Sequence, residues 1–331
     1  MQRAVPYTTL LLLLQAAALG AGEYPALGEH WSLLGDFVYM RRTDIHNHTL
    51  VKDDNKRQCP GRCPNFTVID TKDLVQNFDF EPGYRVGLGF IADPKNSFEG
   101  NFLYLQPWHA KKHAHADQSL SFPLSNQDYA QDFTDASFAQ AEYSSQFWDL
   151  ETNYLRHFGE RGVHYFSLSG IIGLRYFHWD EQFKLIMGNP PDKSPYNIHT
   201  HNRMFGAQLG LDLQIHPNRW LFWNIFAKAG PFANHTEQRQ FMGDQDDTVT
   251  LRHSKRQERE VGIYTDVAAQ VGFRCFKHVY LHGGYQALFF SGLSLAPEQI
   301  SHKVTGSAGK KDHTHGNAII HGLFAGLMFS F

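Results

Sequence analysis

The sequence lacks the features that mark several large classes of protein. Its 331 residues carry 30 Lys and Arg against 33 Asp and Glu, so the formal net charge is only −3. Such a balance gives no overall field that attracts nucleic acid, and we expect no nucleic-acid partner. After the N-terminus there is no run of about 20 apolar residues, which excludes membrane-spanning helices. Helical periodicity is almost absent from the rest of the chain.

Cysteine is also scarce, because the chain has only three. Cys59 and Cys63 stand four positions apart in a polar stretch, a spacing that suits a small disulfide loop. A zinc or redox pair is the alternative interpretation. An exported chain without a second cysteine pair favours the disulfide.

The first residues have the pattern of a secretory signal. Arg3 supplies a positive charge, residues 10–14 are all Leu, and the small residues of 16–22 suit a cleavage site. The apolar run is shorter than a membrane-spanning helix. We therefore expect residues 1–22 to be a cleaved signal peptide and residues 23–331 to form a single domain.

What the sequence does contain is long alternation with a period of two, the pattern of β-strands. In the stretch 197–215, for example, Phe205 and Leu209 occupy one face while Gln208 and Asp212 occupy the other. Strands of globular proteins average about 5 to 6 residues, whereas a tilted membrane strand needs about 9 to 11. The pattern predicts ten long strands, over residues 31–41, 79–92, 97–107, 141–157, 164–183, 197–215, 220–233, 258–275, 279–291 and 318–331.

The connections between these strands alternate between short and long. The short ones cover about 93–97, 158–163, 216–219 and 276–278, and the long ones about 42–78, 106–140, 184–196, 234–257 and 292–317. Outer-membrane barrels have this asymmetry, with short periplasmic turns and long extracellular loops. We predict an all-β fold, a transmembrane antiparallel up-and-down β-barrel of about ten strands, or twelve if residues 67–79 add a hairpin.

The predicted barrel implies a location and partners. An even number of strands places both the N-terminus and the C-terminus in the periplasm of a bacterium, with the barrel in the outer membrane. The last strand alternates up to a terminal Phe331, which resembles the assembly signal of outer-membrane barrels. We therefore expect outer-membrane lipid and the barrel assembly machinery as partners.

Several stretches resemble one family, the outer-membrane β-barrel porins abundant in planctomycete-type bacteria. In chain order these are FEPGYRVGLGF (80–90), LETNY (150–154), GLRYFHWDE (173–181), NRMFGAQLG (202–210) and AKAG (227–230). Together they extend over most of the mature chain. The resemblance implies an outer-membrane barrel through which small solutes pass, and it transfers no catalytic residue.

Strand parity predicts which charged residues face the lumen. Both signs are represented there, so salt bridges across the lumen are expected, and a barrel of ten strands leaves a narrow interior. Two interpretations stay open, a conducting channel lined by these groups and a polar plug that holds the barrel in shape. The predicted lumen residues are Arg85, Glu99, Asp149, Glu151, Arg175, Asp212, Lys228 and Asp266.

Histidine is abundant, with 20 residues, and four pairs have the form His-x-His. In an extended segment the two side chains of such a pair point the same way, so they could share one divalent metal ion. Solvated loop histidines are the other interpretation, and it is the preferred one, so no cofactor is expected beyond a weakly bound metal. The pairs are His46 with His48, His113 with His115, His199 with His201, and His313 with His315, all predicted on the extracellular side.

The leading functional prediction is therefore a porin for small solutes or a structural barrel of the envelope, without enzymatic activity. The alternative is a surface binding protein, an adhesin or a metal binder acting through its histidine-rich loops. An outer-membrane hydrolase ranks below both, because the chain has no Gly-x-Ser-x-Gly nucleophile motif.

Overall fold

The computed structural model describes residues 30–43, 47–55, 67–123, 131–158, 166–218, 220–243, 250–301 and 315–331. Its main feature is a closed ring of ten antiparallel strands. The first strand pairs with both the second strand of the ring and the last strand of the chain, which closes the sheet on itself. The ring consists of β1 (Trp31–Thr43), β4 (Glu81–Asp93), β5 (Asn96–Leu105), β7 (Ala136–Phe158), β8 (Phe166–Asn189), β9 (Asp192–Asn218), β10 (Leu221–Gly243), β11 (Thr250–Phe276), β12 (Val279–Leu293) and β13 (Gly316–Ser330).

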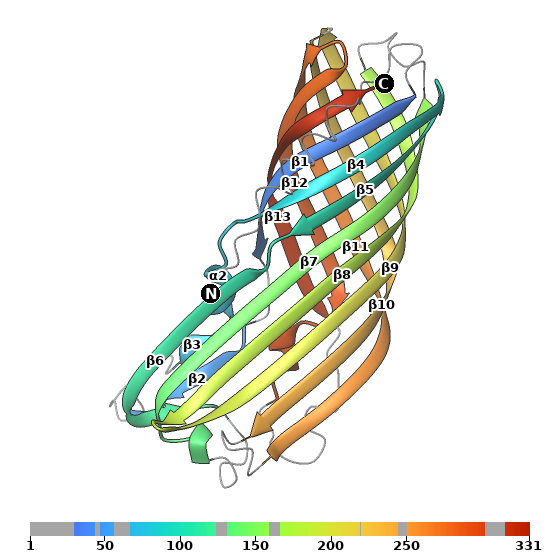
Figure 1. Ribbon diagram of the computed structural model, residues 1–331. Helices are drawn as coiled ribbons and strands as arrows, with labels where there is room; N and C mark the ends of the chain where they lie inside the picture. Colours follow the sequence, from blue (N-terminus) through green and yellow to red (C-terminus); the bar gives the residue numbers. More distant parts are fainter. Residues whose placement is uncertain are drawn as a thin grey trace, which may run out of the picture.

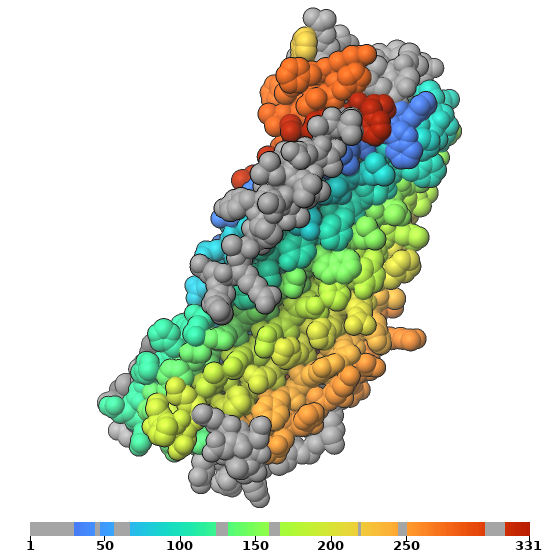
Figure 2. All heavy atoms as spheres, in the orientation of Figure 1, coloured from blue at the N-terminus to red at the C-terminus, as the bar shows by residue number. Residues whose placement is uncertain are grey.

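One half of the barrel wall is much longer than the other. Strands β7 to β11 have 23 to 27 residues, whereas β1, β4, β12 and β13 have 13 to 15. After a break at Gln106 and Pro107, strand β6 (Trp108–Ser121) continues β5 along the same partner, β7. Figure 1 shows these long strands extending past the others, away from the end where β1 begins, and the space-filling view in Figure 2 shows the resulting elongated body. We call these two regions the short-turn end and the protruding half.

The protruding half is filled by short elements that fold against the long strands. They are β2 (Thr49–Asp53), β3 (Thr67–Asp70), the helix α2 (Thr71–Gln76), and the turns η3 (Gln131–Phe133) and η4 (Ala296–Gln299). Strand β2 pairs with β3 and, at two positions, with β6. Leu50, Ile69, Leu74 and Phe78 of this insertion are fully buried. Among the described residues no helix is long and apolar enough to cross a membrane.

The alternation of apolar residues reverses its phase along the long strands. In β9, Phe205, Leu209 and Leu211 point outward and are exposed, while Gln208 and Asp212 are buried inside. Further along the same strand, Tyr196 and Ile198 point inward and are fully buried. Near the short-turn end the barrel is thus apolar outside and polar inside, and in the protruding half the order is that of a soluble protein.

The exposed apolar side chains form a band around the short-turn half of the barrel. Val261, Leu209 and Ile172 are 75%, 66% and 60% exposed, which a soluble wall would not tolerate over so many neighbouring positions. The eleven residues from Phe205 to Ile215 are separated by ten steps of about 3.3 Å, so on a strand tilted by about 40° they cover about 25 Å along the barrel axis, the height of a lipid-facing band. The fold is therefore a transmembrane β-barrel.

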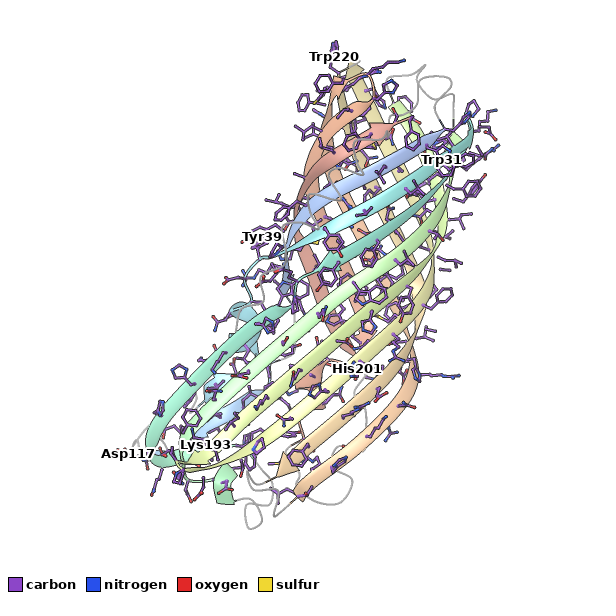
Figure 3. The ribbon with its side chains drawn as sticks, in the orientation of Figure 1. Trp31, Tyr39, Asp117, Lys193, His201 and Trp220 are labelled. Carbon is purple, nitrogen blue, oxygen red and sulfur yellow. The ribbon has the colours of Figure 1, made fainter. Side chains whose placement is uncertain are left out.

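Aromatic residues border this band on both sides, as in membrane barrels. Trp31 packs on Phe90 at a ring distance of 4.7 Å at the short-turn end, and Tyr84 stacks on Tyr104 at 5.5 Å at the other border. Trp148 continues the second border, 5.4 Å from Tyr176. Figure 3 shows Trp31 and Trp220 at the short-turn end and Asp117 and Lys193 at the far end of the protruding half.

The predicted fold class and the ring of about ten strands are confirmed, whereas three of the predicted long connections are wrong. Residues 108–121 of the connection 106–140 form β6, and β7 already starts at Ala136. The connection 184–196 is a tight turn at Pro190 and Pro191, and most of 234–257 belongs to β10 and β11. These segments were predicted as connections because their outer faces are polar, whereas a lipid-facing strand has an apolar outer face. In the protruding half the alternation keeps its period but reverses its phase.

Candidate functional site

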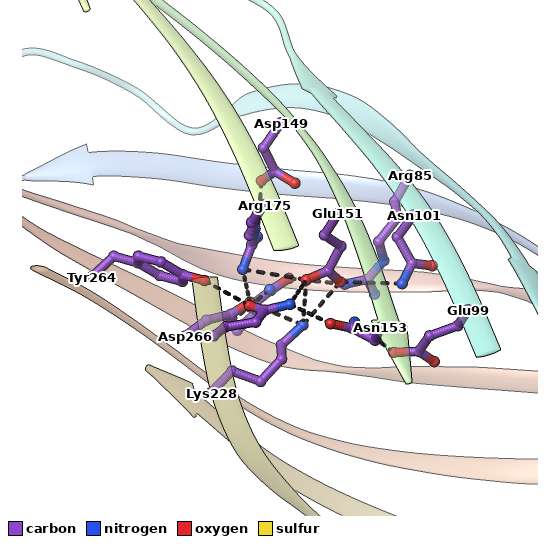
Figure 4. Close-up of polar contacts among 12 residues, drawn as sticks. Arg85, Glu99, Asn101, Asp149, Glu151, Asn153, Arg175, Lys228, Tyr264 and Asp266 are labelled. Carbon is purple, nitrogen blue, oxygen red and sulfur yellow. Dashed lines mark hydrogen bonds and ion pairs between the residues drawn. The ribbon is translucent and has the colours of Figure 1, made fainter. Parts of the chain in front are cut away.

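The centre of the barrel contains a buried layer of charged side chains, shown in Figure 4. Arg175, from β8, lies 2.9 Å from Asp149 on β7, 2.7 Å from Asp266 on β11 and 3.6 Å from Glu151 on β7. Lys228, from β10, binds both oxygens of Glu151, at 2.9 and 2.8 Å, and lies 3.5 Å from Asp266. Two cations and three carboxylates thus tie four strands together across the interior.

Amides and a phenol complete the hydrogen bonding of this charge layer. Gln208 donates to Glu151 at 3.1 Å and also to Asn153, and the hydroxyl of Tyr264 donates to Gln208 at 2.8 Å. Asn153 in turn donates to Glu99 at 2.9 Å. Glu151 and Asp266 are therefore held by several donors each, which is the condition under which buried charges are tolerated.

A second charged group, toward β1, joins the same layer. Arg85 pairs with Asp36 at 2.5 Å and donates to Gln286 at 2.9 Å, and Gln286 donates to Asp266 at 2.8 Å. The ring of His282 lies 2.7 Å from the other oxygen of Asp36. Because Gln286 contacts both groups, the network runs continuously from β1 to β8.

All eight lumen residues that parity had pointed to lie on the inner side of the wall. Seven of them belong to the network just described, and the eighth, Asp212, accepts from Asn224 and from Gln214 near the short-turn end. Sequence reasoning missed Asp36 and His282, although the same parity applied to 31–41 and 279–291 would have found them. It also missed Arg42, which lies just beyond the predicted strand.

A cavity of about 200 Å³ lies inside the barrel at the short-turn side of the charge layer. Its lining includes Arg85, Glu99, Asn101, Asp212 and Lys228. The charged groups among them already have partners, Asp212 in Asn224 and Gln214 and the others in the network, so the wall of the cavity consists of paired side chains.

Beyond the charge layer, toward the protruding half, the interior is packed with aromatic rings. The centre of the Phe177 ring lies 4.7 Å from that of Tyr264 and 5.1 Å from that of Phe290. The ring centres of Phe147 and Trp179 are 5.2 Å apart. Next to these rings, on the side away from the charge layer, the buried Arg42 pairs with Glu181 at 2.7 Å. Its guanidinium also lies 5.1 Å from the centre of the Trp179 ring and 5.3 Å from that of Tyr143.

These layers close the interior of the barrel where the structure describes it. A water-filled channel leaves its lining side chains accessible to water. Instead, Asp149, Arg175 and Asp266 are at most 2% exposed, and Phe177 and Trp179 are 0% exposed. The charge layer therefore acts as a polar plug, and the aromatic layer closes the interior a second time, next to it.

One buried group has part of the arrangement of a hydrolase. The hydroxyl of Ser97 lies 2.9 Å from Nε2 of His157, and Nδ1 of His157 lies 2.6 Å from the hydroxyl of Ser169. All three side chains are buried inside the wall. In a Ser-His-Asp triad the third member is a carboxylate, whereas here it is the hydroxyl of Ser169, which stabilises an imidazolium less. We therefore interpret the group as a buried histidine whose two ring nitrogens both have hydrogen-bond partners.

The structure places the predicted metal-binding histidines differently from the expectation. His113 and His115, expected in a loop, point outward from β6, and His199 and His201, expected at a strand mouth, point outward from within β9. His201 hydrogen-bonds Asp180 at 2.5 Å, and His178 hydrogen-bonds the other oxygen of Asp180 at 2.7 Å. Within the described ranges no three His, Cys, Asp or Glu residues are arranged to hold a metal ion.

Some predictions concern residues that the structure does not describe. The signal peptide 1–22, the pair Cys59 and Cys63, and the histidines His46 and His313 fall outside the described ranges. Their partners in the predicted pairs, His48 and His315, are described, and His315 is exposed just before β13. These predictions stay predictions.

No family model matches the sequence, and no curated protein matches it. The chain is similar to several solved structures of outer-membrane proteins. The outer membrane protease OmpT from Escherichia coli is 10% identical, with a TM-score of 0.47 over 91% of this chain and 97% of that chain. The translocator domain of the autotransporter NalP from Neisseria meningitidis is 7% identical, with a TM-score of 0.39 over 98% and 95%. The attachment invasion locus protein Ail of Yersinia pestis is 9% identical, with a TM-score of 0.27 over 92% and 99%. All three TM-scores lie below 0.5, so the barrel is established by the hydrogen-bonded ring and the apolar band described above.

Proposed function

We propose that this protein is a non-conducting barrel of the bacterial outer membrane that acts through the surface of its protruding half. The observation that supports this most directly is the closed interior. A porin, as the family resemblance implied, needs an aqueous path past Arg175, Asp266 and Phe177, which are at most 2% exposed.

The protruding half suits a binding or anchoring surface. Strands β6 to β11 continue beyond the apolar band with polar side chains outside and apolar side chains inside. The apolar interior stabilises this extension in water, much as a core stabilises a soluble domain. This agrees with the surface-binding alternative, and the proposal assigns the protein no catalytic reaction, no resident cofactor and no transported solute.

Conductance across a planar lipid bilayer tests the proposal. We expect purified, refolded protein to insert without discrete current steps, and protease protection of the apolar band in the same preparation shows that insertion occurred. A known open barrel in the same lipid serves as the positive control. Reproducible steps whose size scales with salt concentration would overturn the proposal.

We also propose that the protruding half faces the outside of the cell, with both chain ends in the periplasm. An epitope inserted at the turn formed by Pro190 and Pro191 should be stained by antibody on intact cells. The same epitope inserted at Lys95, in the turn between β4 and β5, should be stained only after the cells are opened. The reverse pattern would invert the orientation.

A further inference from the structure

The outer surface has a row of basic side chains along the border of the apolar band. His178, on β8, lies directly opposite Arg203 on β9, Arg203 lies opposite His235 on β10, and His235 lies opposite Arg259 on β11. Paired residues of neighbouring strands have Cβ atoms about 4.5 to 5.5 Å apart, so the four positions are consecutive neighbours. We call them the basic row.

The basic row adjoins lipid-facing residues on one side. The next row of paired positions toward the short-turn end is Tyr176, Phe205, Ala233 and Val261, of which Phe205 and Val261 are exposed apolar side chains. The basic row therefore lies where the hydrocarbon of a bilayer ends and its headgroups begin.

The carboxylates on this face are already engaged. Asp180 accepts from His178 and His201, and Glu237 binds Arg239 at 2.6 Å and Lys255 at 3.0 Å. Among the described residues neither Arg203 nor Arg259 forms an ion pair, and both are exposed. Arg203 and Arg259 lie on either side of His235 in the row. Two guanidinium groups therefore share one stretch of the surface, and the described residues supply no carboxylate partner for either.

We propose that the basic row binds the phosphate group of a lipid in the leaflet that meets the protruding half. The guanidinium groups of Arg203 and Arg259 would hold the phosphate oxygens, since the planar fork of arginine matches phosphate geometry. The acyl chains would then lie along Phe205 and Val261. Charge and apolar contact thus point to one class of ligand, a lipid that carries an anionic phosphate group, rather than to a soluble anion. The inference rests on the proposed membrane location and is independent of the closed interior.

Native mass spectrometry of the detergent-solubilised protein tests this with phosphatidic acid and phosphatidylcholine of the same acyl chains as probes. Wild type should retain phosphatidic acid in preference to phosphatidylcholine. In the double variant Arg203→Gln/Arg259→Gln this preference should fall by about fivefold for each cation removed. The reason is that one Lys or Arg near an anionic lipid surface contributes about 1 kcal/mol of binding free energy, which corresponds to about fivefold in affinity. The double variant Lys95→Gln/Arg156→Gln removes the same charge at the short-turn end and should keep the preference.

Three outcomes would overturn the proposal. Wild type could show no preference, the two double variants could lose it equally, or excess inorganic phosphate could displace the lipid and reveal a site for a soluble anion. Heat-modifiable mobility on gels shows that each variant is folded. Current steps in the bilayer experiment would refute the closed interior and leave this result unaffected, so the two failures are distinguishable.

Discussion

The buried charge layer makes a strong prediction for the substitution Arg175→Met. The side chain of Arg175 contacts Asp149, Asp266 and Glu151, and all four groups are almost fully buried. Without the guanidinium, three carboxylates share the single cation of Lys228. Breaking a buried ion pair by removing one partner costs about 3 to 5 kcal/mol, because a charge is left uncompensated in a medium of low dielectric constant. We expect a loss of this size in the free energy of unfolding.

The measurement is urea unfolding of protein refolded in phospholipid vesicles, followed by tryptophan fluorescence. The midpoint should fall while the dependence on urea stays unchanged, because the surface exposed on unfolding is the same. As a matched control, Arg239→Met removes an arginine that is paired with Glu237 on the exposed outer face and should cost less than about 1 kcal/mol.

A compensating variant separates charge from shape. Adding Asp149→Asn and Asp266→Asn to Arg175→Met removes the uncompensated negative charges and should recover more than half of the loss. A cost below about 1 kcal/mol for Arg175→Met, or a triple variant less stable than the single one, would refute the idea that this layer holds the barrel closed by charge pairing.

Three further substitutions and conditions test the rest of the structure. Leu209→Arg, in the middle of the apolar band, should destabilise the protein in vesicles by about 2 to 4 kcal/mol, because it places a charge in the hydrocarbon. The control Gln182→Arg, on the outer face beyond the band, should change stability by less than about 0.5 kcal/mol. Equal effects of the two substitutions in the same urea assay would show that the lipid-facing band does not lie where the exposed apolar residues place it. Phe177→Ala, in the aromatic layer, should cost about 3 to 5 kcal/mol by opening a cavity, and the lipid-facing Phe205→Ala less than half of that; the reverse order in urea unfolding would contradict the filled interior. Beyond the band, half-burial by itself raises the pKa of Asp180, but the hydrogen bonds from His178 and His201 outweigh it and hold the pKa well below its usual range, so this carboxylate stays charged. The contribution of Asp180 to stability should therefore be fully present above about pH 4 and be lost only at lower pH. The urea midpoints of wild type and Asp180→Asn, compared from about pH 7 to about pH 3, measure this; a difference between them that does not shrink toward low pH would refute the assignment.

The barrel could be predicted because its lipid-facing half has a simple rule. Each strand must present an apolar residue outward at every second position, so stretches such as 205–215 reveal both the strand and its parity. The same parity indicated that Arg175, Glu151 and Asp266 point inward. Which groups pair could not be predicted, because the contact of Arg175 with Asp149 depends on the register of β7 against β8, and its contact with Asp266 depends on how β8 and β11 face each other across the barrel.

The protruding half was misread for the opposite reason. Once a strand leaves the bilayer, water favours polar residues outside and apolar residues inside, so the pattern along β8 and β9 keeps its period and reverses its phase. His113 and His115 were therefore expected in a loop, although their backbone continues the wall, whereas His199 and His201 had been expected at a strand mouth and lie well inside β9.

The sequence by itself thus determined a transmembrane barrel of about ten strands and the inward direction of its charges, because local alternation records which medium each side chain meets. Only the tertiary structure decided that the interior is closed, since closure depends on how Arg175, Phe177 and the insertion carrying Phe78 meet across the barrel. It also decided that Arg203 and Arg259 belong to one surface row, because their proximity is set by strand register, a property of paired segments that no single segment encodes.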